Sequence, residues 1–102
     1  EYQRWADVRI SLLLQSPAPV KWVSVEPMLG PIDLRPWLAD LHWVIVGDES
    51  GKGRRPANLD WVRYLRDQCI GGNVAFYFKQ WHLDGKKVSL PMLDGRQWAE
   101  PP

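Results

Sequence analysis

The sequence predicts an α/β protein with a small, mostly parallel three-stranded sheet and flanking helices, in the order α-β-α-β-α-β. Three short apolar runs rich in strand-forming residues alternate with stretches of helical spacing, and prolines or glycines separate them. Strands separated by helices imply parallel pairing with right-handed crossovers. This order corresponds to part of a barrel or to a short doubly wound sheet. We expect a single domain over residues 1–102, with a turn-rich tail from residue 82.

The first two elements are a helix over residues 1–15 and a strand over residues 20–26. The apolar residues of the helix follow three-to-four spacing, as in Trp5, Val8 and Leu12. Two prolines after residue 15 end the helix, because proline cannot continue one. The strand alternates in polarity and is rich in β-branched residues, and a proline stops it.

The middle of the chain is predicted to hold a short helix, a buried strand and a long helix. Asp33 is expected to cap a short helix that runs to Leu38. Residues 42–47 are continuously apolar, as in a strand covered on both faces. The long helix begins at Asn58 or Asp60 and ends at Ile70, before two glycines. Its inner face is predicted to contain Leu59, Trp61, Val62, Leu65 and Cys69.

The third strand is expected over residues 74–79, and the tail beyond it is marked by turn signals. Asp-Gly pairs at residues 84–85 and 94–95 are typical of tight turns. Between them, residues 87–92 form either a short strand or an extended coil. We favour a small hairpin-like tail.

Composition excludes several classes of protein. The net charge of +1 gives the whole chain no strong attraction to nucleic acid or membrane. The single cysteine, Cys69, excludes an internal disulfide and a multi-cysteine metal site made by this chain alone, and its helical setting predicts a buried apolar role. No apolar run is long enough to span a membrane and no signal peptide is present, so we expect a soluble cytosolic protein. The chain opens within a helical pattern and without methionine, which indicates a fragment.

Polar residues follow each predicted strand, and the carboxyl ends of parallel strands share one rim where ligands bind. Glycines there let backbone N–H groups approach a ligand, and the polar side chains supply acceptors and donors. The alternative interpretation is a set of paired strand-end residues and an ordinary loop. The candidate ligand-binding residues are Glu26, Gly47, Asp48, Glu49, Ser50, Gly51, Lys79 and Gln80.

A second candidate is a basic patch near Trp61 and Tyr64, because basic residues among aromatic ones suit single-stranded nucleic acid. The alternative is a solvated face balanced by Asp60 and Asp67. The patch would consist of Lys52, Arg54, Arg55, Arg63 and Arg66. Neither histidine has a partner at a spacing typical of catalysis or of a metal site, so no catalytic residue and no metal ligand is assigned.

Five blocks occur in an order that resembles the C-terminal half of the phage Gp-thirty-seven/Gp-sixty-eight family, whose uncharacterised members are similar to radical-SAM enzymes. The resemblance departs at Asp48, where a second glycine is expected. The blocks are residues 22–31, 43–51, 61–69, 78–81 and 93–96. Full-length members carry a three-cysteine motif near their N-terminus, which implies a 4Fe-4S cluster and S-adenosylmethionine. The resemblance therefore implies the second half of a partial barrel, without the redox centre.

Two functions follow as expectations. In the first, the chain is a phage- or prophage-derived radical-SAM-like partial barrel that binds no cofactor and catalyses nothing alone. In the second, it is a small phage-encoded binding or inhibitor protein that acts on a host defence complex, for example of CRISPR type, or on a nucleic-acid complex in the bacterial cytoplasm. Both imply a protein partner or self-association, with nucleic acid as a further candidate and no membrane. A hydrolase or transferase that uses Glu26, Glu49 and His82 is the weakest hypothesis, because no nucleophile–base pair is evident.

Overall fold

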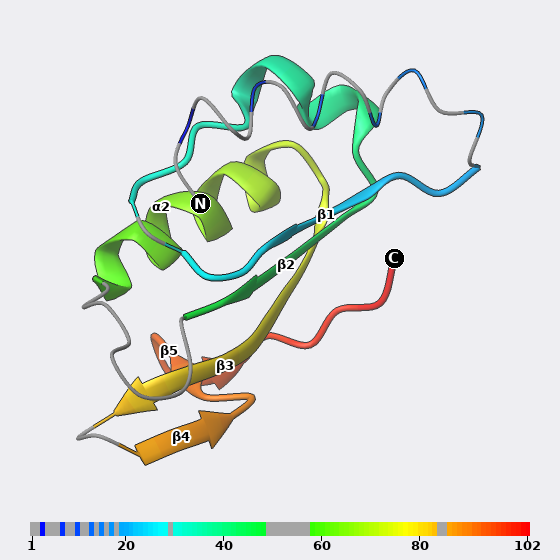
Figure 1. The fold of residues 1–102 in the computed structure, drawn as a ribbon. Helices are drawn as coiled ribbons and strands as arrows, with labels where there is room; N and C mark the ends of the chain where they lie inside the picture. Colours follow the sequence, from blue (N-terminus) through cyan, green and yellow to red (C-terminus); the bar gives the residue numbers. More distant parts are fainter. Residues whose placement is uncertain are drawn as a thin grey trace.

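The protein is a small mixed α/β domain, seen in a computed structural model (Figure 1), and its described residues include a four-stranded, mostly parallel sheet and the long helix α2. The structure describes residues 3, 7, 10, 13, 15, 17, 19–28, 30–48, 58–83 and 86–102. The sheet order is β1-β2-β3-β4. The sheet does not close into a barrel.

The parallel part of the sheet consists of β1 (Trp22–Val25), β2 (Trp43–Gly47) and β3 (Ala75–Leu83). These three strands occur where the apolar runs predicted them. The third strand is longer than predicted and continues four residues beyond Lys79. The expectation of three strands was wrong, since β4 (Lys86–Ser89) adds an antiparallel fourth strand next to the second half of β3.

The helical elements are α2 (Leu59–Gly71) and the 3-10 helix η1 (Arg35–Asp40). The side chain of Asn58 accepts the N–H of Asp60, and this cap starts α2 at one of the two predicted positions. Asp33 Oδ1 accepts the N–H of Arg35 at the start of η1. Of the predicted first helix, which was expected over residues 1–15, residues 3, 7, 10 and 13 are helical and residue 15 lies in a turn; the other positions lie outside the described residues.

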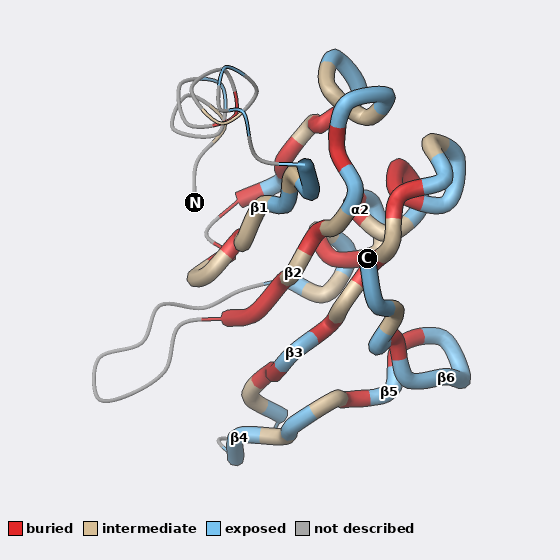
Figure 2. Tube along the Cα trace, turned by 90° about the vertical axis from the view of Figure 1, so that its right-hand side faces the viewer, coloured by how far each residue is buried: buried red, intermediate tan, exposed pale blue. Residues whose placement is uncertain are grey.

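The hydrophobic core lies between one face of the sheet and α2 (Figure 2). Every second residue of β2 and of the first half of β3 is fully buried there, and α2 contributes three predicted residues of its inner face. The central members of this core are Val44, Val46, Val62, Leu65, Cys69, Phe76 and Phe78. Leu59 and Trp61 pack against it and stay partly exposed. Helix α2 therefore covers one face of the sheet.

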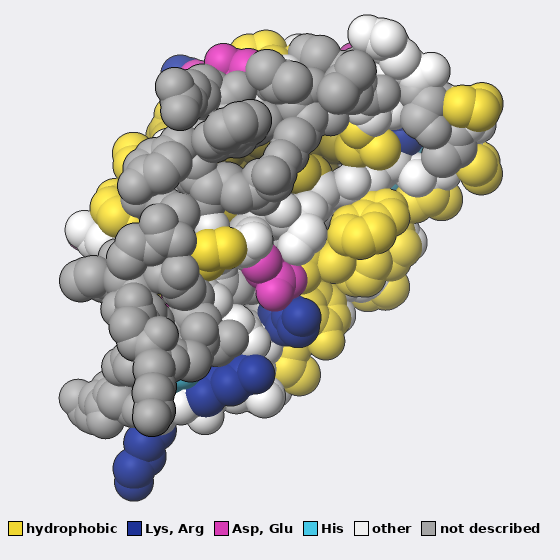
Figure 3. Space-filling view, in the orientation of Figure 1, with side chains coloured by type: hydrophobic (Ala, Val, Ile, Leu, Met, Phe, Trp, Pro, Cys, Tyr) yellow, Lys and Arg dark blue, Asp and Glu magenta, His cyan; other side chains and the backbone are white. Residues whose placement is uncertain are grey.

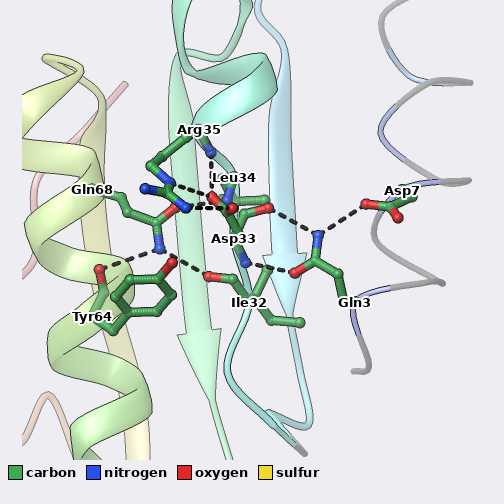
Figure 4. Close-up of polar contacts among 8 residues, drawn as sticks. All are labelled: Gln3, Asp7, Ile32, Asp33, Leu34, Arg35, Tyr64 and Gln68. Atoms are coloured by element: carbon green, nitrogen blue, oxygen red, sulfur yellow. Dashed lines mark hydrogen bonds and ion pairs between the residues drawn. The ribbon is translucent and has the colours of Figure 1, made fainter.

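A buried glutamine that the apolar pattern did not predict joins α2 to the segment before η1 (Figure 4). Gln68 Oε1 accepts the N–H of Leu34 at 2.6 Å, and Gln68 Nε2 donates to the carbonyl of Ile32 at 2.8 Å. On the other side of this segment, Gln3 accepts the N–H of Asp33 and donates to its carbonyl oxygen. Two glutamine amides thus act as the hydrogen-bonding partners of a segment that has no strand neighbour among the described residues.

The tail completes the free edge of β3. The first half of β3 pairs with residues 98–100 of the tail. The N–H of Phe78 donates to the carbonyl of Trp98, and the N–H of Glu100 donates to the carbonyl of Phe76. Its second half pairs with β4. Strands β5 (Met92–Leu93) and β6 (Arg96–Gln97) form the small hairpin that the second Asp-Gly pair predicted, with Asp94 and Gly95 at positive φ. The first Asp-Gly pair, residues 84 and 85, lies outside the described residues.

Candidate functional site

The second face of the parallel sheet carries no helix among the described residues, and we call it the open face. It is defined by the outward residues of β1, β2 and β3: Trp22, Ser24, Trp43, Ile45 and Tyr77. The ring centroids of Trp22 and Trp43 are 6.1 Å apart, and those of Trp43 and Tyr77 are 5.9 Å apart. Trp22 is 48% exposed. Parallel sheets are normally covered on both faces, so a half-exposed aromatic row on such a sheet is suited to binding.

A groove of about 500 Å³ runs along this face towards the carboxyl ends of the strands. Figure 3 shows the hydrophobic side chains over β1 and β2 beside an acidic and a basic group. The groove is lined by Trp22, Ser24, Glu26, Ile45, Tyr77 and Lys79. Two predicted site residues, Glu26 and Lys79, therefore form the polar end of an otherwise largely apolar groove.

Glu26 and Lys79 form an ion pair across the sheet. Glu26 Oε2 lies 3.3 Å from Lys79 Nζ, and Glu26 Oε1 accepts the hydroxyl of Ser24 at 3.1 Å. Lys79 was predicted at the end of a strand, and this was wrong, because it lies within β3 at an irregularity. Phe78 pairs with Val46, but Gln80 pairs with Gly47, so Lys79 is an extra residue relative to β2. The carbonyl of Lys79 accepts the N–H of Leu90, which lies beyond the end of β4.

The extra residue turns Gln80 to the same side of the sheet as Lys79, and glycine at position 47 makes room for it. A Cβ on Gly47 would lie 3.2 Å from the Cγ atoms of both Glu26 and Gln80. The carbonyl of Gly47 accepts the N–H of Met28 at 2.9 Å. Glu26, Gly47 and Gln80, which are far apart in the sequence, are therefore in close contact.

Asp48 follows directly and is only 6% exposed. Its carbonyl accepts Gln80 Nε2 at 2.8 Å, and its carboxylate accepts the N–H of His82 at 2.7 Å. His82 Nδ1 lies 3.0 Å from both carboxylate oxygens. Asp48 was among the predicted site residues, but His82 was not predicted to be its partner. The signal for this pair is the continuation of β3 beyond Lys79, but the extra residue interrupts the alternation of buried and exposed side chains by which a strand is recognised.

The other candidates of the central loop, Glu49, Ser50, Gly51, Lys52, Arg54 and Arg55, lie outside the described residues. Arg63 and Arg66 lie on α2, which covers the opposite face of the sheet from the groove. Both form ion pairs with Asp94 in the β5–β6 turn, and Arg63 also pairs with Asp60. The guanidinium groups of Arg66 and then Arg63 lower the pKa of the Asp94 carboxyl. Their positive charge is therefore balanced by neighbouring acids.

The side chains of Cys69 and His42 have structural roles. Burial raises the pKa of the Cys69 thiol to about 12, as expected for a core residue. His42 Nδ1 accepts the backbone N–H of Lys21 at 3.0 Å, beside β1. Within the described part of the chain, no three His, Cys, Asp or Glu side chains are grouped to hold a metal ion. Nor does any described helix have the length and apolar character needed to cross a membrane.

Fold and site together define a small α/β protein with a grooved, partly aromatic open face. A family model described as "Protein of unknown function (DUF5131)" matches residues 1–102, and the chain belongs to this family. No curated protein and no solved structure matches the chain.

Proposed function

We propose that this chain is the ligand-binding part of a partial barrel related to radical-SAM enzymes, that it derives from a phage or prophage, and that it is not catalytic by itself. The observation that supports binding is the groove on the open face, in which aromatic side chains meet the Glu26–Lys79 pair. A volume of about 500 Å³ lies in the range typical of small-molecule sites. The sequence resemblance supplies the enzyme class.

The ligand in this proposal is S-adenosylmethionine. Glu26 would attract its ammonium group and Lys79 its carboxylate, and both charged side chains are within reach because their own pairing is partly exposed and weak. The indole of Trp22 and the ring of Tyr77 offer stacking area for the adenine, and aromatic faces attract a sulfonium cation. A 4Fe-4S cluster does not fit this chain, because the single cysteine of the chain, Cys69 on α2, is buried in the hydrophobic core. We therefore derive no redox step from these residues.

Isothermal titration calorimetry with S-adenosylmethionine tests this proposal. We expect saturable binding that weakens at least about tenfold in Glu26→Gln and in Trp22→Ala, since each removes a contact worth roughly 1.5–3 kcal/mol. Asp67→Asn, an exposed change on the far side of the sheet, is the matched control and should bind like the parent. Absence of binding, or equal binding by all four proteins, contradicts the proposal.

The second candidate is a cytoplasmic binding or inhibitor protein that acts on a host defence or nucleic-acid complex. It is favoured by the 48% exposure of Trp22 next to Trp43, because exposed tryptophans are enriched at the centres of protein interfaces. Sedimentation with a purified defence complex should then give a stoichiometric assembly that Trp22→Ala abolishes. A steep salt dependence of oligonucleotide binding would instead indicate nucleic acid as the partner.

A further inference from the structure

We propose that the open face and the lysines of β4 together bind single-stranded nucleic acid, with bases stacked on the aromatic side chains and phosphates held by the lysines. The inference deepens the second candidate function, on which it rests, because it names the partner and the surface that binds it. It depends on an aromatic row on a bare sheet, on exposed lysines along the same face, and on a helix side whose described arginines are already paired.

The aromatic row supplies a stacking surface. Trp22, Trp43 and Tyr77 come from three neighbouring strands, and successive ring centroids are 6.1 and 5.9 Å apart. Trp22, at the edge of the sheet, is the most exposed of the three. Every nucleobase has a flat face, so aromatic side chains bind bases of any sequence. By analogy, small RNA-binding domains stack two or three bases on aromatic side chains of a four-stranded sheet.

The pairing of β3 with β4 places a lysine of β4 on the same face. Gln80 lies on the open face, because its Cγ is 3.2 Å from the position of a Cβ on Gly47. His82 follows by two residues and lies on the same side, and Lys87 is its cross-strand partner. Figure 3, in the orientation of Figure 1, shows basic side chains that continue from the acidic group at the end of the groove towards the β3–β4 hairpin. Positive charge therefore extends along the face beyond the groove.

The charge of the β4 lysines is available to phosphates. Lys86 and Lys87 are both exposed, and neither forms an ion pair with a described acid. Lys79 shares its charge with Glu26, in a partly exposed pair of the kind that contributes little. The other described acid of the rim, Asp48, is only 6% exposed. A polyanion on this face would thus meet more positive than negative charge.

The arginines on the helix side are compensated. Arg63 and Arg66 both pair with Asp94. Arg96 lies over the ring of Trp98, 3.8 Å from its centroid. The net charge of +1 is therefore distributed unevenly over the molecule. Lysines are depleted at protein interfaces, whereas basic side chains beside aromatic ones are typical of single-strand binding, so the open face fits nucleic acid better than a protein partner.

Fluorescence anisotropy with a labelled oligothymidylate of about ten nucleotides tests the inference, since this length lies within the site sizes of single-strand binders. We expect saturable binding that weakens as the salt concentration rises. The same sequence in a duplex should bind less tightly, because its bases are stacked inside the helix. An oligouridylate of equal length distinguishes RNA from DNA as the source of the strand, and binding of either supports the inference.

Two pairs of variants locate the strand. Trp22→Ala should weaken binding about 5- to 100-fold, whereas Trp22→Phe, which keeps a ring, should retain most of the affinity. Lys87→Gln should weaken binding and lower the slope of log Kd against log salt by about 0.7. Arg63→Gln removes the same charge on the opposite face and should change neither quantity. Thermal melting of each variant establishes that it is folded.

Glu26→Gln separates this inference from binding of S-adenosylmethionine. The change removes a negative charge from the rim and releases Lys79 from its ion pair. The oligonucleotide should then bind at least about twofold more tightly, because one more lysine can contact a phosphate. S-adenosylmethionine should bind less tightly to the same variant. Weaker binding of the oligonucleotide to Glu26→Gln would contradict the assigned place of the phosphates.

Three further outcomes overturn the inference. Absence of oligonucleotide binding does so, and the sedimentation test then decides a protein partner separately. Binding that Trp22→Ala leaves intact, or that Arg63→Gln weakens as much as Lys87→Gln, places the strand elsewhere, although nucleic acid remains the partner. Inorganic polyphosphate that competes as well as the oligonucleotide would show attraction by charge alone, without stacking of bases.

Discussion

The indole Nε1 of Trp43, on the central strand, donates a hydrogen bond of 2.7 Å to the backbone carbonyl of Glu100 in the C-terminal tail. This bond spans 57 positions of the sequence. Glu100 in turn pairs with Phe76 through both its backbone and its carboxylate. The tail is therefore attached to two strands of the sheet.

Trp43→Phe should loosen this attachment. Phenylalanine keeps most of the aromatic packing but loses the donor, so we expect a loss of about 1 kcal/mol in the free energy of unfolding. Amide hydrogen exchange should accelerate at Phe78 and Glu100, whose N–H groups join the tail to β3. Trp22→Phe on the exposed edge strand is the control and should leave exchange at these two amides unchanged.

Gln68 should be among the least replaceable residues of α2. Gln68→Leu removes the partners of the Leu34 N–H and the Ile32 carbonyl inside the protein, and each orphaned group costs about 1–3 kcal/mol. Urea unfolding should show a loss of about 2–4 kcal/mol. Asp67→Asn, at the neighbouring exposed position, should change stability by less than about 0.5 kcal/mol. Equal effects of the two changes would contradict this role of the amide.

Gly47→Ala should disturb the rim. The new methyl group would lie 3.2 Å from the side chains of Glu26 and Gln80, so we expect about 1–3 kcal/mol of destabilisation, measured by thermal melting. Gly71→Ala is a matched control, because a Cβ there meets nothing within 4 Å at the end of α2. Alanine should be neutral or stabilising at that position. Tolerance of alanine at position 47 would mean that the rim is less tightly packed.

Acid should weaken the contact between α2 and the β5–β6 turn. Arg66 and then Arg63 lower the pKa of the Asp94 carboxyl in the folded protein. The contribution of Asp94 to stability is therefore fully present above the ordinary pKa of aspartate, and it is lost as the pH falls through the lower pKa of the folded state. Asp94→Asn should therefore be less stable than the parent at neutral pH. The difference should vanish in strong acid. Unfolding midpoints measured across this pH range provide the check, and a constant difference would contradict it.

Cys69 should be nearly inert in the folded protein. Burial raises its thiol pKa to about 12, and thiolate is the reactive form. A disulfide reagent at pH 8 should react with it slowly in native buffer and rapidly in guanidinium chloride. Rapid native labelling would show that the core opens beside α2.

The sequence predicted what periodicity and turn chemistry control. The three parallel strands, the Asn58 cap of α2 and the Asp94-Gly95 hairpin follow from local pattern, since each depends on neighbouring residues. Gln68 and the Asp48–His82 pair do not, because their partners lie more than thirty positions away. A short strand within residues 87–92 was one of two predicted alternatives, but the place of β4 in the main sheet was not predicted, because its exposed, charged residues carry no apolar run and only the pairing with β3 defines it.

The extra residue in β3 also changes the phase of the strand. Before Lys79, odd-numbered residues of β3 lie on the open face, as Tyr77 does, and beyond it the even-numbered Gln80 does so. Consecutive side chains, Lys79 and Gln80, thus emerge on one side, which a regular strand does not permit. Deletion of Lys79 would restore strict alternation and leave Gln80 on the open face, whereas strict alternation with Lys79 retained would carry Gln80 and His82 to the side of the core. The exact number of residues in β3 therefore decides which side chains reach this rim.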